Sequence, residues 1–180
     1  PDHAWGLREG VSCGVWATRE TWEDIDHYPI EDRHLARPEK NVTVDGIGFT
    51  AFTVEHSTRC PAVGYRVRAG KSSFWYAPDL VYIHEREKAL RGVGLYVGDG
   101  ASLSRSLVRK RGDRLLGHTP VRTQLTWCEK ESVPEAIITH CGREVVQGDE
   151  RTLGAQVRRW ARERGIEARI AYDGMEKVLR

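Results

Sequence analysis

The sequence has no apolar run long enough to cross a membrane, and its longest apolar stretches, such as residues 136–139, suit a buried strand. Its formal net charge of +2 is too small to indicate nucleic-acid or membrane binding. The four cysteines are widely scattered and form no C-x-x-C pair, which favours reduced thiols in a cytoplasmic protein. No repeat, low-complexity tract or linker divides the chain, so we expect residues 1–180 to form one domain.

The order of the predicted elements indicates a layered α/β protein with a mixed sheet. Period-2 alternation predicts two hairpins, which pair residues 41–44 with 49–54 and residues 62–68 with 73–76. Capping residues and helical periodicity predict helices over residues 4–9, 18–23, 85–90, 119–131 and 150–164. Further strands are predicted over residues 11–17, 94–97, 136–139 and 166–171, and a loop or broken helix over residues 27–40.

Several polar residues stand where a predicted strand ends or a predicted helix begins, which is where a layered fold places its active site. They are Asp2, His3, His56, Asp79, His118 and His140. Taken singly, such a histidine is more often a hydrogen-bonded structural residue than a ligand, and an Asp after a proline is an ordinary turn former or helix cap. Together, carboxylate and imidazole groups suit zinc, manganese or iron.

These residues belong to segments that resemble the metallo-β-lactamase superfamily. Pro1-Asp2-His3-Ala4-Trp5-Gly6-Leu7 is similar to the end of the H-x-H-x-D-H signature. The next ligand motifs resemble Val54-Glu55-His56-Ser57 with Gly64-Tyr65-Arg66-Val67, Phe74-Trp75-Tyr76-Ala77-Pro78-Asp79 and Ile137-Ile138-Thr139-His140. The closing Tyr172-Asp173-Gly174-Met175-Glu176 resembles the branch that contains the cyclic phosphodiesterases of phosphonate degradation and, more distantly, ribonuclease Z.

The resemblance implies a four-layer αββα sandwich with mixed sheets, supplied without its first strands. It also implies a site for two divalent metal ions, zinc in the first instance, that share a bridging hydroxide. Asp2, His3 and His140 would bind one ion, His56 would bind the other, and Asp79 would bridge them. The two histidines of H-x-H would precede Pro1, so the sequence is interpreted as truncated within this motif.

Two further residues, His118 and Asp173, have roles implied by the same resemblance, and a third, Asp99, has a role suggested by its place directly after a predicted strand. His118 would donate a proton or contact the phosphate, although a capping role at the start of a helix is the alternative. Asp99 would orient a ligand imidazole, or else merely form a tight turn with Gly98 and Gly100. Asp173 would support a ligand histidine near the metals.

Residues 105–114 hold five basic side chains, at Arg105, Arg109, Lys110, Arg111 and Arg114. Such a segment could attract a phosphate-bearing substrate or RNA. We expect a solvated loop instead, because no aromatic residue is interleaved as a stacking platform.

The predicted function is a metal-dependent hydrolase, foremost a phosphodiesterase acting on a small phosphate diester. Another hydrolase of this fold, such as a lactonase, thioesterase or β-lactamase, and a metal-free binding or scaffold protein are the alternatives. Fold alone does not choose between them. A nucleic-acid partner is less favoured, a membrane partner is not expected, and a homodimer remains open.

Overall fold

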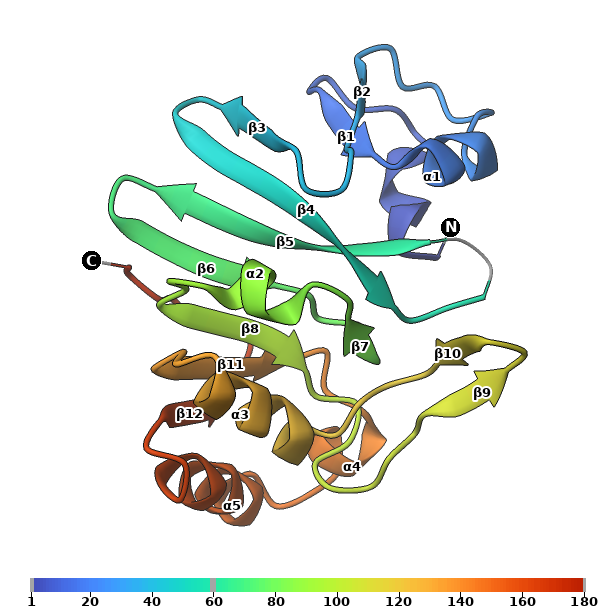
Figure 1. The fold of residues 1–180 in the computed structure, drawn as a ribbon. Coiled ribbons are helices and arrows are strands. Elements are labelled where there is room, and N and C mark those ends of the chain that lie inside the picture. The colour runs from blue at the N-terminus through green and yellow to red at the C-terminus, as the bar shows by residue number, and fades with distance from the viewer. Residues whose placement is uncertain (1, 59–60, 180) are drawn as a thin grey trace.

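The computed structural model describes residues 2–58 and 61–179, with side chains from residue 4 onward. Its main element is a mixed sheet of eight strands in the order β12-β11-β8-β6-β5-β4-β3, with β7 paired to β4 (Figure 1). The strands are β3 (Asn41–Val44), β4 (Ile47–Glu55), β5 (Ala62–Ala69), β6 (Ser72–Tyr76), β7 (Tyr82–Ile83), β8 (Leu95–Asp99), β11 (Glu135–Thr139) and β12 (Glu167–Ile170).

One half of this sheet is antiparallel and consists of the two hairpins predicted from the sequence. Strands β3 and β4 turn at Asp45 and Gly46, whose φ angles of 49° and 79° are the positive values that a tight two-residue hairpin turn needs. Strands β5 and β6 turn through Gly70, where φ is again positive at 58°. Both hairpin predictions are confirmed.

The other half is parallel, because helices connect its strands. Strands β6, β8, β11 and β12 run in the same direction, and the connecting helices are α2 (Arg86–Leu90), α3 (Val121–Lys130), α4 (Arg143–Val146) and α5 (Glu150–Arg162). Helix α3 contacts β8 and β11, and α5 contacts β12 and α3. The buried residues Val157, Trp160 and Ala161 of α5 form the apolar stripe that the sequence predicts. The mixed α/β class is therefore confirmed.

A smaller unit precedes the sheet. It contains the 3₁₀ helix η1 (Asp2–Leu7), β1 (Val15–Ala17), α1 (Arg19–Asp24) and β2 (Arg33–Leu35), with β1 and β2 paired in parallel. Its own core is formed by Ile25, Tyr28 and Ile30. Thr18 caps α1 as predicted, since its side chain accepts the backbone N–H of Thr21 at 3.3 Å.

Three predictions of local structure are wrong. His118 does not open a helix, because α3 begins only at Val121 with Pro120 as its N-cap, a residue whose fixed φ suits a helix start. Residues 105–114 do not form a plain loop: β9 (Arg109–Arg111) and β10 (Arg114–Leu116) make a hairpin whose turn contains Gly112 at φ 60°. The predicted loop 27–40 contains the short strand β2, which pairs with β1.

No helix in the described part of the chain is both long and apolar enough to cross a bilayer. Cys13, Cys128 and Cys141 are free thiols, whereas Cys60 lies outside the described residues.

Candidate metal centre

The topology brings the ends of four strands to one edge of the sheet. Strand β4 runs antiparallel to β5, which runs antiparallel to β6, and β6, β8 and β11 are parallel. The carboxyl ends of β4, β6, β8 and β11 therefore meet at the same edge, the usual place for a site in such a sheet. The residues found there are His56, Asp79, Asp99 and His140, and His118 joins them two residues after β10.

Asp79 is the carboxylate around which three imidazoles gather. His56 Nδ1 lies 2.8 Å from Asp79 Oδ1, and His118 Nδ1 lies 3.2 Å from the same oxygen. His140 Nε2 lies 3.9 Å from Asp79 Oδ2. The Asp79 side chain is only 14% exposed, whereas the three imidazoles around it are 25–35% exposed, so the carboxylate lies beneath the rings. Four predicted site residues are thus brought together.

Asp99 lies behind this group and is completely buried. Its Oδ2 lies 2.9 Å from His118 Nδ1 and accepts the backbone N–H of Leu80 at 3.1 Å. Its Oδ1 accepts the backbone N–H of Ala101 at 2.8 Å and lies 3.8 Å from His140 Nδ1. The Asp99 carboxylate therefore holds both the backbone of Leu80, next to Asp79, and the imidazole of His118.

Gln124 of α3 holds Asp99 in place, although no pattern in the sequence points to this residue. This fully buried side chain accepts the backbone N–H of Asp99 at 2.9 Å and donates to the carbonyl of Asp99 at 2.6 Å. Its amide also donates to Thr119 O at 3.1 Å. A Cβ at Gly98 would lie 2.3 Å from Gln124 Oε1, so this glycine makes room for the amide within a strand instead of forming a turn.

The backbone of His140 is unusual for its residue type. Its φ angle of 51° lies in the left-handed region, which residues other than glycine seldom adopt and which is enriched at functional sites. The ring stacks on His118 with centroids 5.6 Å apart and an interplanar angle of 25°. The turn at the end of β11 thus directs the imidazole back into the cluster.

The close contacts shift the protonation equilibria of the site. Hydrogen bonds to Asp79 and Asp99 raise the pKa of His118 to about 10. The hydrogen bond to Asp79 also raises the pKa of His56 above its ordinary value. Burial acts to raise the pKa of Asp79, but hydrogen bonds with His118 and His56 outweigh it and hold that pKa below its usual range.

The donor set fits a divalent cation. Asp79, Asp99, His118 and His140 each offer a ligand atom, and these atoms all lie within 4.8 Å of one another. Two donors on one zinc ion stand about 3.3–3.5 Å apart, given metal–ligand distances near 2.1 Å. The distances from the three imidazoles to Asp79, 2.8 to 3.9 Å, bracket that value. Imidazole nitrogen and carboxylate oxygen are also the ligand types that zinc, manganese and iron accept.

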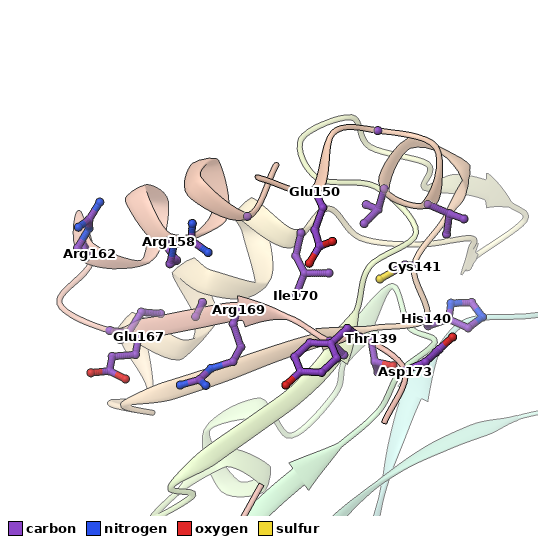
Figure 2. A pocket seen from close by; sticks show the side chains of 18 residues that line it. Thr139, His140, Cys141, Glu150, Arg158, Arg162, Glu167, Arg169, Ile170 and Asp173 are labelled. Atoms are coloured by element: carbon purple, nitrogen blue, oxygen red, sulfur yellow. The ribbon is translucent and has the colours of Figure 1, made fainter. Parts of the chain in front are cut away.

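The remaining predicted site residues are Asp2, His3 and Asp173. The backbone of Asp2 and His3 belongs to η1, but their side chains fall outside the described residues. Asp173 is exposed and lines, together with His140, a groove of about 1100 Å³ beside β12 and α5 (Figure 2). Its predicted support of a ligand histidine stays a prediction.

Comparisons with known proteins agree with this architecture. A family model described as Beta-lactamase superfamily domain matches residues 1–141, and a comparison with curated proteins finds no match.

Three solved structures are similar. The isothiocyanate hydrolase from Delia radicum gut bacteria has a TM-score of 0.70 at 14% identity, covering 98% of this chain and 72% of its own. The metallo-β-lactamase fold protein YhfI from Bacillus subtilis has a TM-score of 0.67 at 14% identity, covering 90% of this chain and 63% of its own. A diphosphatase from the PhnP family has a TM-score of 0.59 at 16% identity, covering 97% of this chain and 63% of its own.

At these identities the likeness concerns the fold alone, and it confirms the metallo-β-lactamase fold that the motifs predict. The chain spans less than two thirds of YhfI and of the diphosphatase.

Proposed function

Because the chain belongs to the beta-lactamase superfamily domain family, we propose that it is a metal-dependent hydrolase that cleaves a small phosphate diester. The observation that carries the proposal is the largely covered Asp79 with His56, His118 and His140 around it. A cluster of carboxylate and imidazole groups with strongly perturbed pKa values is typical of a functional site and offers the ligand types of a metal centre. The similar diphosphatase, whose name refers to phosphate chemistry, favours a phosphate ester as substrate.

Asp79 and His140 of the donor group described above would hold metal, and the motif resemblance adds His56, Asp2 and His3 to them. Two divalent ions, zinc in the first instance and manganese or iron as alternatives, are part of the proposal. When bound, such ions lower the pKa of water toward neutrality and offset negative charge that develops on phosphate oxygens. Asp79 would orient the imidazoles around them through the contacts already described.

His118 would donate the proton that the leaving group requires. Its Nδ1 is taken up by Asp99 and Asp79, so Nε2 is the ring nitrogen that remains to face a substrate. Asp99, which contacts this nitrogen, favours the protonated ring, because a hydrogen bond to a carboxylate raises the pKa of an imidazole. A protonated imidazole beside a scissile ester can donate to the departing alkoxide, the role of a general acid.

Other hydrolase reactions of this fold remain the second candidate, because the similar isothiocyanate hydrolase bears a name that refers to a different substrate. A lactonase, a thioesterase and a β-lactamase-like enzyme would all need the same metal site. These enzymes differ in the substrate that they cleave, so an assay that compares substrates distinguishes them.

The test compares bis(4-nitrophenyl) phosphate with a chromogenic β-lactam and an aryl-substituted lactone at equal enzyme and zinc concentrations. We expect turnover of the diester. His56→Ala should abolish it, and His27→Ala, a change in an exposed histidine of the small N-terminal unit, should leave it intact. Turnover of the lactone alone would overturn the substrate class, and equal effects of the two substitutions would mean that the site is misplaced.

A further inference from the structure

The hairpin formed by β9 and β10 concentrates positive charge beside the site. Four of its six residues from 109 to 114 are basic, namely Arg109, Lys110, Arg111 and Arg114. All four side chains are exposed, and none of them forms an ion pair within the described part of the chain. The only acidic residue in the segment is Asp113 at the turn. We call these four basic residues the arm.

The register of the hairpin places like charges opposite one another. Arg111 pairs with Arg114, and Arg109 stands two residues before Arg111 on the same face. Like charges directly across an antiparallel pair destabilise it, and none of the described carboxylates forms an ion pair with these arginines. An anion from solution that bridges the arginines would relieve the repulsion. Lys110 faces the other side, opposite Leu115.

The base of the hairpin is fixed to the candidate metal centre. The backbone N–H of Gly117 donates to His56 O at 3.0 Å, and that of Leu107 donates to His118 O at 3.3 Å. Gly117 has a φ of 108°, and a Cβ there would lie 2.2 Å from Leu107 O, so only glycine allows this closure. Figure 1 shows the hairpin extending away from the sheet beside the end of β4. The arm therefore has a defined position relative to His56 and His118.

We propose that the arm binds the backbone of a single-stranded oligonucleotide and leads one of its phosphodiesters to His118. The proposal rests on the phosphodiesterase function proposed above. Arg114 precedes His118 by four residues, so the two positions lie at most about 13 Å apart. An oligonucleotide carries a row of phosphates, so one of them can contact the arm while a neighbouring one lies at His118. Arginine suits this role because its planar guanidinium pairs with phosphate through two parallel hydrogen bonds.

The low exposure of Asp79 favours a single strand over a duplex. Asp79 is only 14% exposed, so the scissile phosphate has to approach a largely covered carboxylate, which a flexible strand can do. Duplex DNA is stiff over about 150 base pairs and bends toward such a site only at a cost. The hairpin has no aromatic residue to stack on bases, so the interaction should depend on charge and not on sequence.

The test measures binding of a fluorescein-labelled oligothymidylate of about 12 nucleotides by anisotropy, in EDTA so that nothing is cleaved. The arm variant is Arg109→Gln/Arg111→Gln/Arg114→Gln. Its matched control is Arg68→Gln/Lys71→Gln/Arg91→Gln, which removes the same charge from exposed positions at the opposite edge of the sheet. We expect the arm variant to bind at least tenfold more weakly at low salt. Its slope of log affinity against log salt should be shallower by about 2, the value for three lost phosphate contacts on a single strand.

Two results would overturn the proposal. One is an arm variant that binds as the unmodified protein does, and the other is a control that loses as much affinity as the arm variant. Equal arm-dependent binding of a duplex of the same length would overturn the preference for a single strand. Because the assay needs no turnover, its outcome is independent of whether the protein hydrolyses bis(4-nitrophenyl) phosphate, which tests the proposed function alone.

Discussion

Asp99 Oδ2 lies 2.9 Å from His118 Nδ1, and the same oxygen accepts the backbone N–H of Leu80, the residue after Asp79. This fully buried carboxylate thus links the candidate proton donor to the candidate bridging ligand. It lies at the end of β8, an interior strand that pairs with β11 on one side and β6 on the other, so rigid elements support it.

Replacement of Asp99 by Asn should lower both metal affinity and turnover about 10–100-fold, the usual effect of losing a partner that orients a site imidazole. Asn keeps the shape but removes the charge that favours protonated His118. The alkaline limb of the pH–rate profile should therefore move to lower pH, which a purely structural defect would not cause. Asp45→Asn, in the exposed β3–β4 turn, is the control. An unshifted profile with normal metal affinity would show that Asp99 does not act through His118.

Replacement of Gln124 by Ala should destabilise the fold by about 2–4 kcal/mol, because it leaves the buried N–H and carbonyl of Asp99 without partners. Urea unfolding of the metal-free protein measures this loss. Thr123→Ala, on the exposed face of the same helix, should change the unfolding free energy by less than about 0.5 kcal/mol. Equal midpoints for the two variants would mean that the Gln124 contacts contribute little.

The stability of the metal-free protein should depend on pH in a defined way. The pKa of His118 is raised from 6.5 to about 10, so the stability it contributes is complete below about 6.5 and is lost as the pH rises toward 10. The pKa of Asp79 is lowered from 3.8, so its contribution is present above that value and is lost as the pH falls below it. Stability should therefore be greatest between about pH 4 and 6.5.

Midpoints of urea unfolding, measured in EDTA below, within and above this pH range, test the pH dependence. His118→Gln should flatten the decline above pH 6.5, whereas His27→Gln, at an exposed position, should keep it. A wild-type midpoint that rises between pH 6.5 and 10 would contradict the ion pairs described here.

The sequence predicts the sheet better than it predicts the site. Strand alternation and glycine turns are local signals, and they locate β3 to β6 closely. The positions of His56, Asp79 and His140 follow from the rule that polar residues at strand ends converge on one edge of the sheet. Gln124 could not be predicted, because an amide on a helix gives no sign that it bonds the buried backbone of a residue 25 positions away. The β9–β10 hairpin is not predicted from the sequence, because its consecutive charged residues show no alternation of apolar and polar side chains.

Whether a metal ion is held around Asp79 is measured by the zinc content of the protein after dialysis against zinc-containing buffer and gel filtration. We expect at least one zinc ion per chain in the unmodified protein and in Asp45→Asn, and a loss of bound zinc in Asp79→Asn. No zinc in the unmodified protein, or equal zinc in the unmodified protein and Asp79→Asn, would contradict this expectation.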